Sequence, residues 1–347
     1  MTTALRPYPW QQGLWDSLCR LAQDRRLPHA LLLAAPEGMG KQRFARAFSA
    51  WRLCQQPVAD QASGREGACG ECRSCQLLAA GSHPDLLWVS PETDGEKVSK
   101  VIKIEQARAV VDFANQAAQL QGYRIVVLDP AHALNTASAN ALLKTLEEPG
   151  RDSLFLLLTD QPAALLATIR SRCQLLPLSV PAPEVALDWL RGELADAASA
   201  AILLGLARGA PLAAAQLADS AWFKARSELL ADLTAVAAGE LAPLTAAGRW
   251  QKMDAGEQVT AWQSLLDDAT QLAMAPDELP RHHDLRAGLE RLTATLAAQT
   301  LLEALWQAVE ARRLLDTNVQ PQSILETLWL HWGRETRKRP AGGHHAG

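Results

Sequence analysis

The sequence predicts an α/β domain with a parallel sheet in the first half of the chain, followed by domains made only of helices. Three observations lead to this fold class. Short apolar runs alternate with helical patterns up to about residue 178, which is typical of a parallel sheet covered by helices. A turn of the phosphate-binding type follows the first apolar run. Beyond Pro177, Pro181 and Pro183, helical spacing continues without a convincing strand.

The individual elements follow from the spacing of apolar residues. Five apolar runs are candidate strands: His29–Ala34, Asp85–Val89, Arg124–Leu128, Leu154–Thr159 and Gln174–Leu178. Three segments between them have helical spacing: Gln42–Leu53, Ile104–Gln119 and Thr136–Glu147. We expect domains at residues 1–178, with an insertion at 54–81, at 179–220 and at 221–336, before a disordered tail at 337–347.

The composition restricts the class of protein. The chain has 347 residues, no apolar run of membrane-spanning length and no secretory pattern at its N-terminus, so we expect a cytoplasmic protein without a membrane partner. The net charge of −4 argues against strong binding to nucleic acid by this chain alone. The eleven tryptophans are expected in the core or at a subunit interface, and base stacking is the weaker interpretation because basic residues do not interleave with them.

A degenerate phosphate-binding loop follows the first candidate strand. A functional loop reads G-x-x-x-x-G-K-[ST], because backbone N–H groups bind the phosphates and the Ser or Thr hydroxyl binds Mg²⁺. Here Gly38, Gly40 and Lys41 are present, but Ala35 replaces the first glycine and Gln42 replaces the hydroxyl residue. An amide is a poor magnesium ligand, so the loop predicts P-loop ancestry with weakened chemistry.

The second nucleotide motif is also altered. The third candidate strand ends in Asp129-Pro130, where an ATPase of this type has Asp for the metal and Glu for the attacking water. Losing a general base typically costs about 10²- to 10⁴-fold in rate. We therefore expect a vestigial nucleotide site at Gly38, Gly40, Lys41 and Asp129 that does not hydrolyse ATP, while retention of nucleotide stays open. An active ATPase is the alternative.

Four cysteines predict a metal site. Cys69, Cys72 and Cys75 have C-x-x-C-x-x-C spacing, and Cys54 lies at the end of the preceding candidate helix. Four thiolate ligands suit structural Zn²⁺ and leave no open position for catalysis. An iron–sulphur cluster uses similar spacing, and His83 is an alternative to Cys54 as the fourth ligand. We expect the ion to hold together an insertion of about 25 residues.

Three further motifs carry a resemblance to a known family. They are Leu27-Pro-His-Ala30, Ser171-Arg172-Cys173 and the block Asn140-Ala-Leu-Leu-Lys-Thr-Leu-Glu-Glu-Pro149. With the altered loop and the cysteines, the chain resembles the delta prime family of bacterial DNA polymerase III clamp-loader subunits, closely over residues 8–178 and only in composition beyond about residue 220. The resemblance implies an AAA+ fold consisting of a RecA-like domain, a small helical lid and an all-helical collar.

The resemblance also implies a function and partners. Such a subunit joins a five-membered ring that loads the sliding clamp on primer–template DNA, as part of a DNA-directed DNA polymerase holoenzyme in the cytoplasm, at the nucleoid. It has no ATPase activity of its own, binds zinc, and presents Arg172 in trans to ATP on a neighbouring subunit. Pairing of Arg172 with surface carboxylates is the structural alternative, and a zinc-binding module outside replication is the functional one.

Three other positions complete the predicted site. Thr159 occupies the place of a γ-phosphate sensor in the motor relatives, and a turn-capping role is equally consistent with its position. Leu212 stands where those relatives have an arginine, which is a third loss of nucleotide chemistry. Lys144, Glu147 and Glu148 are interpreted as a solvated face or a subunit contact without a catalytic role.

Overall fold

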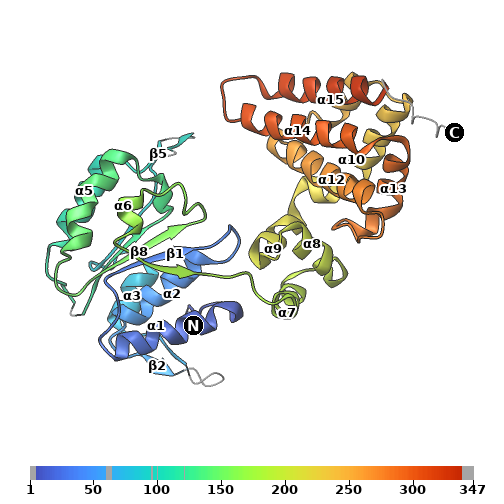
Figure 1. The fold of residues 1–347 in the computed structure, drawn as a ribbon. Coiled ribbons are helices and arrows are strands. Elements are labelled where there is room, and N and C mark those ends of the chain that lie inside the picture. The colour runs from blue at the N-terminus through green and yellow to red at the C-terminus, as the bar shows by residue number, and fades with distance from the viewer. Residues whose placement is uncertain (1–4, 60–64, 95–96, 100, 121, 338–347) are drawn as a thin grey trace. The chain divides into compact units, whose positions relative to one another are not determined.

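A computed structural model describes the chain except for residues 1–4, 60–64, 95–96, 100, 121 and 338–347 (Figure 1). The chain forms two compact units, Met1–Trp189 and Leu190–Gly347. The first unit contains the parallel sheet and the second is helical in its described residues. The predicted division of the second half into a lid and a collar stays a prediction, and the predicted tail beyond Arg337 lies outside the described residues.

The first unit is built on a five-stranded sheet in the order β4-β7-β8-β1-β9, and all its strand pairs are parallel. The predicted strands are confirmed, and each bound shifts by no more than one residue. The strands are β1 (Ala30–Ala34), β4 (Leu86–Val89), β7 (Arg124–Leu128), β8 (Ser153–Thr159) and β9 (Gln174–Pro177). Two short hairpins lie outside this sheet, β2 (Val58–Ala59) with β3 (Glu66–Gly67) and β5 (Thr93–Asp94) with β6 (Lys97–Val98).

The register of the sheet brings the predicted nucleotide motifs to one edge. In the β1–β8 pair Ala34 lies opposite Thr159, and in the β7–β8 pair Leu128 lies opposite Leu157. The loop after Ala34, the acidic residue after Leu128 and the end of β8 therefore meet at the carboxyl edge. Ligands of parallel α/β sheets bind at this edge.

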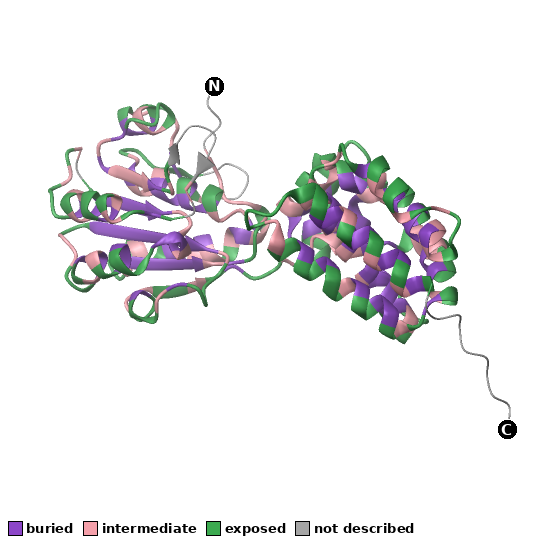
Figure 2. Cartoon of the chain, turned by 90° about the horizontal axis from the view of Figure 1, so that it is seen from above, coloured by how far each residue is buried: buried purple, intermediate pink, exposed green. Residues whose placement is uncertain are grey.

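Helices cover both faces of the sheet (Figure 1). One face packs against α4 (Ile104–Ala114), α5 (Thr136–Glu147) and α6 (Ala167–Arg170) in a continuous apolar core. The other face is covered by α1 (Gln12–Gln23) and α2 (Lys41–Leu53), with α3 (Arg73–Ala79) beyond. The central strands β7, β8 and β1 are buried almost throughout (Figure 2), which explains why they read as continuous apolar runs, whereas the edge strands β4 and β9 are partly exposed.

An aromatic cluster fixes α1 against α2. The buried ring of Trp15 packs edge-on against Phe44 and Phe48, with both centroid distances 5.8 Å. Trp15 also contacts Trp51 near the end of α2. These contacts hold α2 rigidly along its length, and α2 connects the two candidate sites of this unit.

The helix predicted at Ile104–Gln119 is shorter in the structure and ends at Ala114. The residues that follow are used in tertiary contacts, because the N–H groups of Gln119 and Leu120 donate to the buried carboxylate of Asp85. The Arg124 guanidinium, itself buried, donates to main-chain carbonyls at the end of the helix. Arg124 and Asp85 form a buried ion pair, with Nε and Oδ1 3.6 Å apart. Hydrogen bonds to this pair thus override the local helical preference of the residues after Ala114.

The remaining helices lie in or lead into the second unit. They are α7 (Pro183–Glu193), α8 (Ala200–Leu206), α9 (Pro211–Asp219), α10 (Ala221–Ala238), α11 (Pro243–Trp250), α12 (Ala255–Met274), α13 (Arg286–Thr295), α14 (Ala298–Leu314) and α15 (Pro321–Arg337). Short 3₁₀ turns are η1 (Pro9–Gln11), η2 (Ala131–Ala133), η3 (Ala197–Ser199) and η4 (His283–Leu285). No strand occurs among the described residues of this unit, as predicted.

Tryptophans form the centre of the second unit. Trp262 on α12 packs edge-on against Trp329 and Trp332 on α15, with centroid distances of 4.8 and 5.9 Å. All three are buried, which confirms the expected core role, whereas Trp306 on α14 is 72% exposed.

In the described part of the chain no single helix has the length and apolarity to cross a membrane; one pair bent by 114°, Ala197–Leu206 with Pro211–Asp219, meets both criteria jointly.

Candidate functional site

The altered phosphate-binding loop keeps its backbone conformation. Gly38 and Gly40 have φ values of 77° and 81°, in the left-handed region that favours glycine, and Gly40 caps the start of α2. A Cβ atom on Gly40 would lie 2.7 Å from two ring carbons of Tyr8. The two glycines therefore remain necessary for the loop even where its chemistry is altered.

The N-terminal segment closes over this loop. Trp10 Nε1 donates to the carbonyl of Met39 at 3.1 Å, and Gln11 Nε2 donates to the carbonyls of Met39 and Gly40 at 2.9 and 3.0 Å. The Tyr8 and Trp10 rings stack with centroids 4.7 Å apart. The role of this segment was not predicted from the sequence, because its local signal is no more than an aromatic pair around a proline.

Lys41 is directed at its own loop. Its ammonium group donates to the carbonyls of Ala35 and Pro36 at 2.7 and 2.9 Å. Burial lowers the pKa of Lys41, and nearby acidic residues, Asp160 first, oppose that shift. In this structure the lysine charge is thus engaged by the loop carbonyls.

Gln42 binds the carboxylate that would orient a metal. Its Nε2 atom donates to Asp129 Oδ2 at 2.8 Å, across the carboxyl edge of the sheet. Burial raises the pKa of Asp129, and the hydrogen bond from Gln42 opposes this shift. Pro130 follows directly and offers no proton acceptor on its side chain. The structure therefore brings the predicted loop and Asp129 together, joined by an amide.

Thr159 is engaged within the protein. Its buried hydroxyl accepts a hydrogen bond from the Gln161 N–H at 3.0 Å and lies 3.0 Å from His132 Nδ1. This geometry corresponds to the turn-capping alternative for Thr159. His132 was not singled out from the sequence; it lies in η2 just after Asp129-Pro130, and its position beside β8 depends on the sheet.

Arg172 lies at the surface and is paired. Its Nε atom donates to Glu147 Oε1 at 2.7 Å, and its Nη2 atom contacts the same oxygen. Its Nη1 atom donates to the carbonyl of Thr168 at 2.8 Å and to Ser171 Oγ at 3.3 Å. The Arg172 side chain is 30% exposed, and among the described residues Glu147, Thr168 and Ser171 are its hydrogen-bond partners. It is therefore not directed at the phosphate-binding loop of its own chain.

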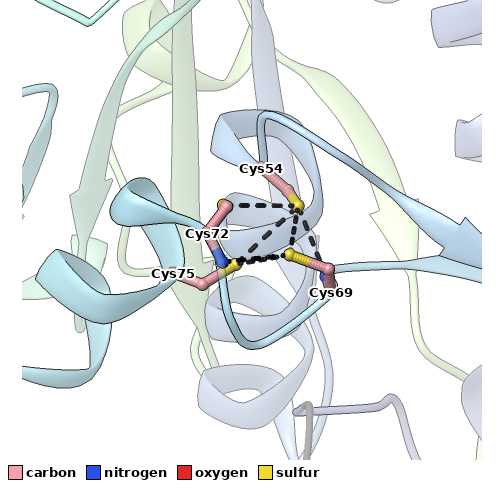
Figure 3. Close-up of side chains that lie close together, drawn as sticks. All are labelled: Cys54, Cys69, Cys72 and Cys75. Atoms are coloured by element: carbon pink, nitrogen blue, oxygen red, sulfur yellow. Dashed lines mark hydrogen bonds between the residues drawn. The ribbon is translucent and has the colours of Figure 1, made fainter.

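The four predicted cysteines converge at the end of α2 (Figure 3). Cys54, Cys69, Cys72 and Cys75 each place a sulfur atom within 4.8 Å of the other three. Three of the sulfur–sulfur distances are 3.6, 3.9 and 3.9 Å, and all four thiols are free of disulfide bonds. Sulfurs bound tetrahedrally at 2.3 Å to one zinc ion would lie about 3.8 Å apart. The donor set and spacing therefore fit a single tetrahedral ion.

His83 does not belong to this cluster. Its Nε2 atom lies 2.7 Å from Ser74 Oγ, and its Nδ1 atom accepts the Asp85 N–H at 3.1 Å. Ser74 in turn donates to the carbonyl of Leu53 at 2.6 Å. Burial lowers the pKa of His83, and the nearby carboxylate of Asp85 opposes this shift. Both ring nitrogens are used to attach α3 to the sheet, and the four sulfurs remain as the ligand set.

The strand order, the loop after β1 and the acidic residue after β7 define a RecA-like domain of the AAA+ class. Residues 10–182 match the family model described as DNA polymerase III, delta subunit, and residues 220–334 match the model of its C-terminal region. The delta prime subunit of Pseudomonas aeruginosa DNA polymerase III is 41% identical over 71% of this chain and 72% of that protein. The Yersinia pestis delta prime subunit is 35% identical over 94% and 95% of the two chains. This chain belongs to the DNA polymerase III delta prime family.

Proposed function

We propose that this chain is a non-hydrolysing subunit of the replicative clamp loader and that it supplies Arg172 to ATP bound by a neighbouring subunit. Family membership supports the clamp-loader role. The observation that carries the non-hydrolysing part is the hydrogen bond from Gln42 to Asp129. It fills the place of the metal with an uncharged amide of the chain itself.

The chemistry of the site supports this proposal at three points. Gln42 removes the hydroxyl ligand for Mg²⁺, Pro130 removes the general base, and Leu212 removes an arginine that contacts phosphate in the motor relatives. Each loss affects a different interaction with the nucleotide. No single compensating residue can restore all three, so the chain has no ATPase activity of its own.

The case for Arg172 depends on its exposure and on the chemistry of phosphoryl transfer. A guanidinium supplied by another subunit neutralises charge that develops on the γ-phosphate, which is worth about 10³- to 10⁵-fold in rate in known systems. Arg172 is partly exposed at the end of α6, on the Ser-Arg-Cys motif of the resemblance. It is therefore available to an adjacent subunit of a ring.

Assembly with that ring is assigned to the helical unit. Leu302, Trp306 and Val309 lie on one face of α14 and are 39%, 72% and 45% exposed. Their spacing of four and three residues is that of a seam between packed helices. We expect this face to contact a neighbouring subunit in a five-membered ring that acts on the sliding clamp and primer–template DNA, in the cytoplasm at the nucleoid.

The cysteine cluster is assigned to structural Zn²⁺. Four thiolates without an open coordination position stabilise a fold and do not activate water. The cluster connects the end of α2 to α3 through an insertion whose own strands contain only two residues each. The ion thus replaces the apolar core that this insertion is too small to form.

Three measurements test the proposal. The purified chain should turn over no more ATP than a Lys41→Ala control, and clear turnover would favour the active ATPase. In a loader reconstituted with its partner subunits, Arg172→Ala should leave the ring assembled and lower the rate at the site that it completes by about 10³-fold or more. Unchanged single-turnover hydrolysis at every site would remove the role of Arg172. Failure to co-purify with loader subunits would favour a zinc-binding module outside replication.

A further inference from the structure

We propose that Glu147 is a positioning residue that restrains Arg172, and that their ion pair has to open before the guanidinium can bind a γ-phosphate on the neighbouring subunit. This inference rests on the proposed role of Arg172. It also revises the interpretation of Glu147 from the sequence, in which this residue was part of a solvated face. Helix α5, which carries most of the Asn140–Pro149 motif, would then act on the Ser-Arg-Cys motif through Glu147, the last residue of the helix.

The hydrogen bonds of Arg172 occupy both edges of its guanidinium. Bidentate phosphate binding uses either the Nε–Nη2 edge or the Nη1–Nη2 edge. Glu147 binds the first edge through Nε and Nη2, and the Thr168 carbonyl and Ser171 Oγ bind Nη1 on the second. A two-bond contact with phosphate therefore requires that Arg172 give up a partner within its own chain.

The backbone around Arg172 is fixed, so this exchange takes place in the side chain. The Arg172 N–H donates to the carbonyl of Ile169 at 3.1 Å, and the next N–H, of Cys173, donates to Arg170. Ile169 is buried, and Cys173 packs against the same apolar core as Leu142 of α5. The two elements that carry Glu147 and Arg172 are thus held together beneath the pair, and only the side chains are free to reorient.

Charge and exposure make the pair easy to open. Glu147 is the last residue of α5, where the helix dipole disfavours a carboxylate, and Arg172 offsets that cost. The two side chains are 48% and 30% exposed, a setting in which ion pairs are weak. A triphosphate carries more negative charge than the single carboxylate of Glu147 and binds a guanidinium more strongly. The triphosphate therefore displaces the carboxylate from Arg172, and opening the ion pair lowers the rate of ATP hydrolysis by a small factor.

Glu147→Gln tests the restraint, since it removes the charge and keeps the size of the side chain. Glu148→Gln is the matched control, because it makes the same charge change one residue away on an exposed side chain. In the reconstituted loader, Glu147→Gln should raise ATP hydrolysis without clamp or DNA by about two- to fivefold, the factor expected for an exposed ion pair. This gain should shrink as salt is added, and Glu148→Gln should match the wild type.

The double variant Glu147→Gln/Arg172→Ala separates this role from a structural one. Its rate should equal that of Arg172→Ala alone, because Glu147 acts only through the guanidinium. If Arg172→Ala lowers hydrolysis while Glu147→Gln leaves it unchanged or lowers it, the restraint is wrong and the proposed function stands. If Arg172→Ala has no effect, the proposed function itself fails. Should Glu147→Gln prevent ring assembly, the same comparison is made with Glu147→Asp, whose shorter side chain weakens the pair and retains the charge.

Discussion

The two ends of α2 carry two sites that differ in how their polar groups are satisfied. At its start, Lys41 donates to loop carbonyls and Gln42 donates to Asp129, so each charged group has a partner from the chain. At its end, Cys54 and three other thiols have mainly one another, at sulfur–sulfur distances near 3.6 to 3.9 Å. At the first site the charged groups are paired within the chain, whereas the second gathers four sulfur atoms that could hold one metal ion.

From this difference we infer that the cysteine site depends on a bound ion and the nucleotide site does not. A polar group that loses its hydrogen-bond partner on burial destabilises the fold. A protein that no longer binds a ligand therefore has to provide new partners, from its own residues, for the groups that bound this ligand. The Gln42–Asp129 bond does so at the nucleotide site. At the cysteine site His83 and Ser74 bind each other, and among the described residues the group that could hold a metal consists of the four cysteines.

The largest effect is expected from Cys72→Ser. Bound zinc should fall from about one ion per chain to nearly none, and the protein should lose several kcal/mol of stability, since structural zinc contributes about 10–16 kcal/mol in small zinc-binding peptides. Metal analysis and hydrogen exchange in α3 measure both effects. Cys173→Ser is the control and should keep its metal. Full metal content in Cys72→Ser would contradict the assignment of Cys72 as a metal ligand.

The next effect is expected from Gln42→Ala, which leaves the half-buried carboxylate of Asp129 without its amide donor. An ordinary intramolecular hydrogen bond contributes about 0.5–1.5 kcal/mol to stability, so the free energy of unfolding should fall by that amount. Gln12→Ala on α1 removes the same side chain at a position without a comparable bond and serves as the control. Equal stability of the two variants in denaturant would show that the nucleotide end is not internally satisfied.

A change of pH sharpens the contrast between the two ends. Burial raises the pKa of Asp129 above its ordinary value. The protonated carboxyl group therefore stabilises the folded protein below the ordinary aspartate pKa. This stabilisation is lost as the pH rises through the folded-state pKa. The stability difference between Gln42→Ala and wild type should therefore shrink as the pH falls from neutral towards the ordinary aspartate range. At the cysteine end, stability should fall as the pH falls, because protonation of the thiolates releases the metal. A pH-independent difference, from denaturation curves at several pH values, would contradict this account.

The smallest effect is expected from Lys41→Ala in the assembled loader. Because this ammonium is bound to its own loop and the site lacks a base, total ATP hydrolysis should change by less than about twofold. The equivalent lysine substitution in an active motor subunit is the control and should abolish hydrolysis at that subunit. A large loss with Lys41→Ala would mean that this site takes part in catalysis.

The sequence was most informative where a signal is local. The five strands follow from short apolar runs, and the degenerate loop and the cysteine spacing follow from a few residues each. The end of α4 was missed because Asp85, distant in sequence, binds the N–H groups that would have continued the helix. The short helix α3 and the two small hairpins were also not predicted, since two-residue strands carry almost no pattern.

The sequence by itself determined that the parallel sheet forms, that the nucleotide motifs are altered and that four thiols can meet, because each depends on residue type and short spacing. Only the tertiary structure decided which groups satisfy one another: Gln42 with Asp129, His83 with Ser74 and Arg172 with Glu147. These pairs join residues that are separated by 87, 9 and 25 positions. Their geometry is fixed by strand register and helix packing, which no local pattern of residues encodes.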